Sequence, residues 1–393
     1  MGGKRHLYEI DLMRAIIILG VVCVHVISFF NTFETPLSVR NLALDAAMSV
    51  LHFTREAFLF ITGLVLFVNY YRRPFSAKSF WKKRFTLIVI PYLFWNAAYV
   101  LYTGTYFQNF DWSPVGLLRT YGKAVLTGDE YFMYFLVISM QLYLVFPLLI
   151  DGLRRWRRGH VAVLAASFGL QLALMAINKL YLQPLDPAQV PAWIRWLFVY
   201  RDRFLLTYQF WFVAGALLAI HYEQVKSFVL RHPRWLYTAL AAGLAVLVGH
   251  YLIDRLWLGE PEETAVMVLQ PIMVPYSLLV TITLWYLGLR WAMVRKEARV
   301  RRLTQAVTFF GGASFGVFLI HPFALHVMDD AVATLQASPS VRLWLLPAGI
   351  LFVYLTSAGI AYAIGRVPWL GYVVGKKTKP VRSAAGSLSH VAR

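Results

Sequence analysis

Apolar runs of about 20 residues recur along the whole chain of 393 residues, and short polar segments separate them. A bilayer core is ~30 Å thick, so a helix needs about 20 mostly apolar residues to cross it. By this measure the pattern predicts ten transmembrane helices and hence an all-α, polytopic membrane bundle. The expected limits are 12–30, 47–70, 85–106, 131–150, 160–182, 204–220, 235–253, 264–289, 306–328 and 343–365.

The composition agrees with a chain solvated mainly by lipid. Hydrophobic residues make up 59% and charged residues 15%, whereas a soluble protein has about 25% charged residues. Only one cysteine is present, Cys23, which excludes an internal disulfide and a cysteine-cluster metal site.

The net charge of +19 raises the possibility of a nucleic-acid partner, but the positions of the charges contradict it. The N-terminus up to and including Arg14, the tail from residue 366 and the segments 71–84, 151–160, 221–234 and 290–303 together hold 28 of the 38 lysines and arginines. Cytoplasmic loops of membrane proteins collect such residues. We therefore expect both termini in the cytoplasm and no nucleic-acid partner. Residues 1–370 form one predicted membrane domain, and residues 371–393 form a basic tail that we expect to be disordered near anionic lipid.

Two ionisable residues in the first span are the clearest candidates for function, because such groups are costly inside a membrane. His25 follows Arg14 by eleven residues, so the two share a helix face and lie about 16 Å apart along the axis. Arg14, at the cytoplasmic edge, can hold a phosphate or carboxylate, and the deeper His25 can act as a general base. Alternatively, Arg14 is an anchor paired with Asp11, and His25 is a packed core histidine.

The ninth span contains a second intramembrane histidine, His321. Counted along their helices, His25 and His321 lie about 20 and 22 Å from the cytoplasmic ends, so the two could meet at one depth. His321 and His326 are five residues apart, a poor spacing for two metal ligands on one helix, and we expect no metal site.

The segment Gly312–Gly316 of the same span matches the G-x-S-x-G nucleophile elbow. That elbow requires a strand before a helix, whereas this segment lies in an apolar helix. A small-xxx-small packing face is the favoured interpretation.

Two further charged groups have both a functional and a structural interpretation. Glu56 in the second span, which follows Arg55, either orients a histidine on another helix or forms an interhelical salt bridge. Lys82, Lys83 and Arg84 precede the third span and either bind a nucleotide phosphate or anchor the helix at the membrane surface.

Together these stretches resemble the membrane-bound acyltransferase 3 family of bacterial cell-surface modification enzymes. The stretches that carry the resemblance are Glu9–Arg14 with His25, Glu56–Gly63, Lys82–Arg84 with Pro91, Tyr131–Leu136 leading to Pro147, and Ser314–Pro322. The resemblance implies a helical bundle in the bacterial plasma membrane. It also implies transfer of an acyl group, often acetyl, from cytoplasmic acyl-CoA to a surface glycan or lipid-linked sugar.

Residue by residue, the resemblance assigns the catalytic base to His25, with Glu56 or His321 orienting it or stabilising charge. Donor contacts fall to Arg14, Lys82, Lys83 and Arg84. The family's Arg-x-x-Arg motif would begin at Arg84, but Leu87 occupies its second position. The size and the N-terminal motif look closest to members near poly-N-acetylglucosamine (intercellular adhesin) synthesis.

The aromatic content supports a second hypothesis, an exporter or flippase of a surface polysaccharide or lipid-linked sugar. Trp95, Tyr131 and Tyr134 could bind substrate in either case, because sugar rings stack on aromatic faces. A third hypothesis, a sensor or scaffold without chemistry, is disfavoured by the pairing of Arg14 with His25.

Overall fold

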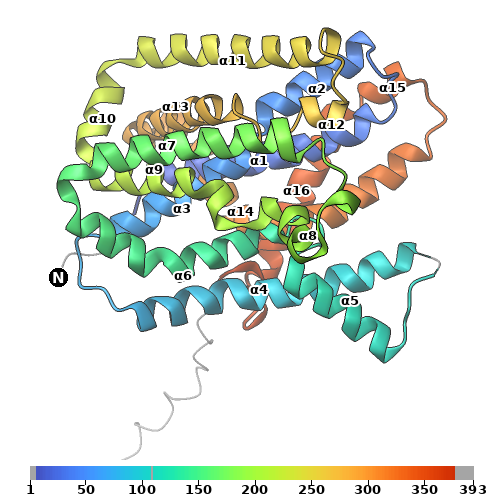
Figure 1. Cartoon of the computed structure of the whole chain (residues 1–393), viewed down its shortest axis with the longest axis horizontal. Coiled ribbons are helices and arrows are strands. Elements are labelled where there is room, and N and C mark those ends of the chain that lie inside the picture. The colour runs from blue at the N-terminus through green and yellow to red at the C-terminus, as the bar shows by residue number, and fades with distance from the viewer. Residues whose placement is uncertain (1–5, 108, 377–393) are drawn as a thin grey trace, which may run out of the picture.

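The computed structural model describes residues 6–107 and 109–376, and in this part of the chain the regular elements are all helical (Figure 1). The longer helices are α1 (Tyr8–Asn31), α2 (Val39–Leu51), α3 (Thr54–Tyr70), α4 (Ala77–Tyr106), α5 (Pro114–Thr127), α6 (Tyr134–Arg155), α7 (His160–Ile177), α9 (Gln209–Ile220), α10 (Tyr222–Arg231), α11 (Pro233–Leu256), α13 (Met273–Val294), α14 (Arg301–Ala333) and α16 (Leu346–Ile364). Short helices are α8 (Ala192–Val199), α12 (Glu262–Ala265), α15 (Pro339–Leu343) and η7 (Leu370–Val374).

Of the ten predicted spans, nine are confirmed as long apolar helical segments within the described residues, and the sixth, 204–220, qualifies only together with α10. Within the described residues, nine helical segments have the length and hydropathy to cross a membrane, and a tenth counts if Leu205–Ile220 and α10 form one span bent by 91°. The second span is broken between α2 and α3. The eighth begins at Met273 rather than at 264, because the short helix α12 ends at Ala265 and residues 266–272 form a loop. Pro275 lies in the first turn of α13, where a missing N–H costs nothing.

α1 lies in the interior of the bundle, packed against α2, α3, α13, α14 and α16 (Figure 1). Glycines permit the closest approaches at its first turn. A Cβ on Gly288 would lie 2.6 Å from the Glu9 carbonyl oxygen, and one on Gly311 would lie 2.5 Å from that of Asp11.

Of the two glycines predicted to form a packing face, Gly312 and Gly316, only Gly316 contacts another helix. Gly316 approaches Ala361 of α16, but a Cβ on Gly312 would meet nothing within 4 Å. Gly311 contacts α1 instead, because one residue's step rotates the contact by about 100° around the helix. Ser314, the centre of the apparent elbow, bonds its own helix at the Gly311 carbonyl over 2.9 Å.

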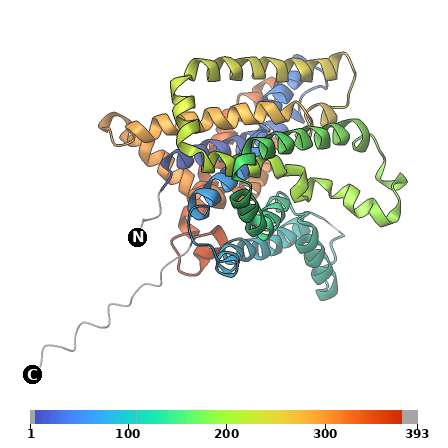
Figure 2. The same ribbon diagram turned by 60° about the vertical axis from the view of Figure 1, so that its left-hand side comes forward.

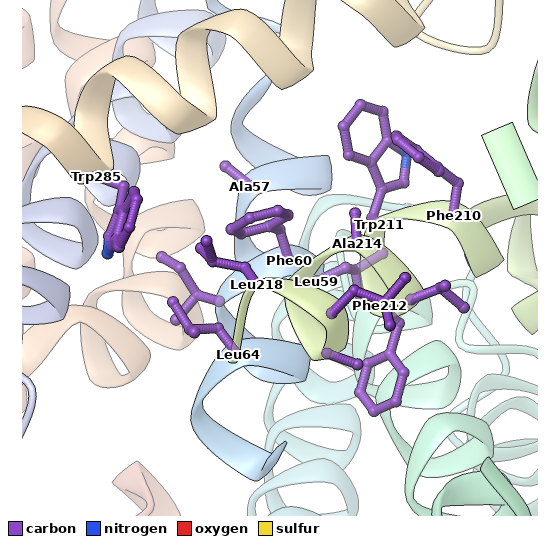
Figure 3. Close-up of a cluster of buried hydrophobic side chains, with 14 of the residues drawn as sticks. Ala57, Leu59, Phe60, Leu64, Phe210, Trp211, Phe212, Ala214, Leu218 and Trp285 are labelled. Atoms are coloured by element: carbon purple, nitrogen blue, oxygen red, sulfur yellow. The ribbon is translucent and has the colours of Figure 1, made fainter. Parts of the chain in front are cut away.

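The main hydrophobic core centres on α3 and α9, whose buried aromatic and aliphatic side chains fill the space between them (Figure 3). Gly63 and Gly215 lie where the two backbones nearly touch, with hypothetical Cβ atoms 2.4 Å and 2.0 Å from carbonyl oxygens of the opposite helix. α11 and α7 lie at the periphery and expose apolar side chains (Figure 1). α10 connects the end of α9 to the start of α11, and it lies at 91° to the segment Leu205–Ile220 (Figures 1 and 2).

The C-terminal end of the described chain packs on the bundle. η7 contacts α4, α14 and α16, and the Val373 carbonyl accepts a 2.8 Å hydrogen bond from the Trp95 indole. The rest of the predicted tail, residues 377–393, lies outside the described residues.

Candidate active site

Three aromatic rings from three parts of the chain meet inside the bundle. The His25 and His321 rings lie 5.4 Å apart between centroids, and the Phe132 ring stacks on both, at 4.1 Å from His25 and 5.2 Å from His321. The prediction that the two histidines meet at one depth is confirmed. Packing of α1 against α14 brings them together, and Phe132 comes from the turn that precedes α6.

The chain segment at His321 holds that imidazole in one orientation. Pro322 has no N–H to give to the Phe318 carbonyl four residues earlier. The His321 Nδ1–H donates to that carbonyl instead, over 2.8 Å, and lies 3.2 Å from the Val317 carbonyl. Nε2 must then carry a lone pair, and it is buried without a hydrogen-bond partner among the described residues. A proline directly after a histidine is the sequence signal for this arrangement.

His25 is held differently. Its ring is fixed by stacking on Phe132 and His321, and no described residue makes a hydrogen bond to either of its nitrogens. It also lines two cavities, one of about 310 Å³ and one of about 650 Å³. A ligand in either cavity can therefore reach an imidazole whose nitrogens are free to accept or donate a proton.

The smaller cavity lies between His25 and the predicted sugar-binding tyrosines. Tyr131 and Tyr134 line it together with Arg55 and Phe132. The Arg55 guanidinium donates a 2.7 Å hydrogen bond to the Tyr208 hydroxyl and lies 5.0 Å from the centre of the Tyr134 ring. Trp95, the third predicted substrate contact, is buried elsewhere, against η7 and Tyr99.

The larger cavity is lined by residues at the opposite end of α1 from Arg14. It includes Ser28 of α1, His52 after α2, and Glu262 and Glu263 of α12. His52 lines both cavities, and its Nδ1–H donates to the Val266 carbonyl over 2.8 Å. Three of these lining residues were not predicted from the sequence: His52, Arg55 and Phe132. Phe132 carried no signal, because it is one of 28 phenylalanines.

The loop before α6 positions Tyr131 and Phe132. Tyr131 has a left-handed φ of 47°, a costly conformation for a tyrosine, and its hydroxyl bonds His326 over 2.9 Å. Asp129 stabilises this loop, because its carboxylate accepts a 2.6 Å hydrogen bond from the Arg203 guanidinium. Burial by itself would raise the pKa of the Asp129 carboxyl, but the bonds from Arg203 and Thr127 outweigh burial and lower the pKa. For the neighbouring Glu130, burial raises the pKa.

The predicted donor contacts lie at the other end of α1. Arg14 is half-buried and within electrostatic range of Asp11, Tyr143 and Arg84. Asp11 forms a 2.7 Å hydrogen bond with His6, and its carboxylate forms no ion pair with Arg14 among the described residues. The fold thus brings together two predicted donor contacts, Arg14 and Arg84, from α1 and α4. Lys82 is exposed and Lys83 is half-buried on the same turn of α4, and Leu87 follows one turn later.

Glu56 is buried in α3 with 3% exposure, and its Oε2 has no hydrogen-bond partner among the described residues. Neither the expected histidine contact nor the alternative salt bridge occurs within that part of the chain. Arg55 turns instead towards Tyr134 and Tyr208, because adjacent helical residues point about 100° apart. The catalytic assignment of Glu56 stays a prediction.

Comparison with known proteins gives one match. The model of the acyltransferase 3 family, described as an acyltransferase domain, matches residues 7–366. No curated protein and no solved structure matches. The matched range includes every residue of the ring cluster, both cavities and the region around Arg14 and Arg84.

Proposed function

This chain belongs to the acyltransferase 3 family and is a multi-pass helical membrane acyltransferase, and from that premise we propose its reaction. It moves an acyl group, in the first instance acetyl, from cytoplasmic acyl-CoA to a hydroxyl of a cell-surface or lipid-linked glycan. Its location is the bacterial plasma membrane. The resemblance to the poly-N-acetylglucosamine branch makes that glycan the first acceptor to test.

The observation that carries this proposal is the state of His25. Its nitrogens make no hydrogen bond to a described residue, yet stacking fixes the ring and two cavities reach it. A packed structural histidine would instead satisfy its nitrogens within the protein, as His321 does at Nδ1. His25 therefore has the accessibility and the open bonding capacity of a general base.

In the proposed step, His25 accepts the proton of an acceptor hydroxyl as the hydroxyl oxygen attacks the thioester carbonyl. The new C–O ester bond forms and the C–S bond breaks. The CoA thiolate leaves, and the proton held by His25 neutralises it. His321 stabilises the imidazolium of its neighbour, because its own Nε2 keeps a lone pair beside the ring cluster.

The charge distribution supports a donor that enters from the cytoplasmic end. Arg14 and Arg84 lie near one another at one end of α1, where they would bind CoA phosphates, with Lys82 and Lys83 close by on α4. Arg14 and His25 are about 16 Å apart along α1, a distance for the flexible thioester arm to cover. On the opposite side, the rings of Tyr131 and Tyr134 would hold the sugar.

The test is acyl transfer by purified protein supplied with radiolabelled acetyl-CoA and glycan acceptor. His25→Ala should lower kcat by about 100-fold or more, the usual contribution of a general base. The matched control is His232→Ala, because His232 is an exposed histidine that lines neither cavity. Wild-type kcat in His25→Ala at equal folded protein would overturn the mechanism. Vectorial glycan movement without acyl-CoA would favour the exporter hypothesis instead.

A further inference from the structure

A separate cavity of about 1050 Å³ lies where the ends of α3 and α9 meet the start of α7. Its lining includes Arg72 and Arg73 after α3, Arg157 before α7, and His160 and His221. Glu223 is the one acidic residue among its lining residues. Three guanidinium groups against one carboxylate give this cavity a preference for anions.

The backbone beneath these arginines is fixed by another arginine. Arg154, near the end of α6, donates hydrogen bonds of 2.8–3.0 Å to the carbonyls of Tyr70, Tyr71 and Arg73. Cations commonly bond the last carbonyls of a helix in this way. The turn that carries Arg72 and Arg73 is therefore held in place before any ligand arrives. Arg72 itself makes no ion pair or hydrogen bond through its side chain to a described residue.

The opposite wall is fixed as well. His160 is 5% exposed, and its Nε2–H donates to the Leu153 carbonyl over 2.9 Å. Its Nδ1 must then accept, so the 2.9 Å contact with His221 is an N–H donated by His221 Nε2. Arg157 is anchored through Nε, which donates to the Arg154 carbonyl over 3.2 Å. The terminal nitrogens of the Arg157 guanidinium make no hydrogen bond to a described residue.

Part of the cavity lining is apolar. Leu7, Phe67, Val68, Ala219 and Ile220 line it. A ligand that fits both parts carries a phosphate at one end and an apolar or extended group at the other. Arginine forks match phosphate oxygens in pairs.

This cavity is distinct from the predicted donor contacts. Neither Arg14 nor Arg84 lines it. The Arg84 guanidinium lies about 6 Å from the rings of Tyr70 and Tyr143, and neither of those two tyrosines lines the cavity.

We propose that this cavity is a second anion site, which binds the phosphate group of an amphiphilic ligand through Arg72 and Arg157. Two sources have this chemistry, the headgroup of an anionic phospholipid and the phosphates of a CoA molecule. The proposal does not depend on the acyl-transfer mechanism, since binding is measured without turnover.

The experiment uses the full-length protein in nanodiscs and the double variant Arg72→Gln/Arg157→Gln. Its control is Arg155→Gln/Arg158→Gln, which removes the same charge from exposed arginines of the same segment that do not line the cavity. One arm measures retention of phosphatidylglycerol against phosphatidylcholine by native mass spectrometry. The other measures the Kd of CoA. Thermal unfolding confirms that each variant is folded, and Arg157→Gln alone replaces the double variant if the latter is not.

We expect the cavity variant to weaken one of the two ligands by about tenfold or more and the control to stay within about twofold. Loss of phosphatidylglycerol retention supports the lipid source, and loss of CoA affinity supports the nucleotide source. Unchanged binding of both ligands, or an equal loss in the control, would overturn the proposal. The binding measurements can be interpreted even if the wild-type protein transfers no acetyl group in the earlier assay. Each of the two proposals can therefore be refuted without refuting the other.

Discussion

Replacing Pro322 by alanine should release His321 from its fixed orientation. The Phe318 carbonyl accepts the His321 Nδ1–H because residue 322 has no N–H to offer. An alanine at 322 restores that N–H, four residues after Phe318, in line with the helix axis. The backbone donor then competes with the imidazole for one carbonyl, and helical geometry favours the backbone.

The size of the effect follows from the bond that is lost. His321 would keep only the 3.2 Å contact with the Val317 carbonyl, which already serves as the normal helical acceptor for the backbone N–H of residue 321. A hydrogen bond of this kind contributes about 0.5–1.5 kcal/mol. The oriented fraction of His321 should therefore fall by about 2- to 10-fold, and kcat should fall with it. The helix gains a backbone bond, so the unfolding temperature should stay equal or rise.

The assay is steady-state acyl transfer together with thermal unfolding. Pro91→Ala is the matched control, since Pro91 also lies inside a helix, α4, but no described side chain donates to the Leu87 carbonyl that it leaves open. A drop in kcat with unchanged KM for acetyl-CoA in Pro322→Ala, and unchanged kcat in Pro91→Ala, is the expected result. Wild-type kcat in Pro322→Ala alongside inactive His321→Ala would refute the claim that the proline orients the histidine.

Three further predictions concern stability, each read by thermal or denaturant unfolding of purified protein. Gly215→Ala should cost about 1–3 kcal/mol, because its Cβ would lie 2.0 Å from the Phe60 carbonyl oxygen; an unchanged unfolding temperature would contradict the close helix contact. Asp129 has a lowered pKa, so its stabilisation is present above the ordinary carboxyl pKa of about 3.9 and is lost as the pH falls through the lowered value. Asp129→Asn should lose about 1–3 kcal/mol at pH 7 and show a flatter acid profile, and an unaltered profile would count against the bond to its arginine. Lys179→Met should cost about 1–3 kcal/mol, because the buried Asp254 loses its 2.5 Å ion pair and keeps the 3.0 Å contact with His250; the double variant with Asp254→Leu should recover part of that loss.

The architecture could be predicted from local patterning because a bilayer imposes a simple length rule on any helix that crosses it. Nine of the ten apolar runs correspond to long apolar helical segments of the described chain, the sixth counts only as a bent pair with α10, and the eighth begins at Met273 rather than at 264. The prediction of helix contacts was wrong where a step of one residue, which rotates the side chain by about 100° around the helix, decides which helix is contacted. The step from Gly312 to Gly311 is an example, since both positions have the same composition and only the packing of α14 on α1 distinguishes them.

Part of the candidate active site could also be predicted from local patterning. Helical rise placed His25 and His321 at equal depth before any fold was known, and their rings lie 5.4 Å apart. The same rise could not say that Phe132 would stack on both or that Tyr131 and Tyr134 would share the cavity while Trp95 would not. Those contacts depend on how the loop before α6 folds against α1 and α14, and that loop has no periodicity from which to predict it.

The sequence by itself determined the membrane class, the order of the long apolar helices, the alternation of basic loops and the position of each intramembrane histidine along its helix. These are properties of one chain segment in one solvent. Only the tertiary structure decided which polar side chains have a hydrogen-bond partner and which do not. His321 donates to the carbonyl that Pro322 leaves without a backbone donor, whereas no described residue makes a hydrogen bond to the His25 ring. The same holds for Arg72 and Arg157, which line one cavity because the end of α3 and the start of α7 lie close together. Hydrogen-bond satisfaction is a relation between segments distant in sequence, and for that reason local pattern alone does not contain it.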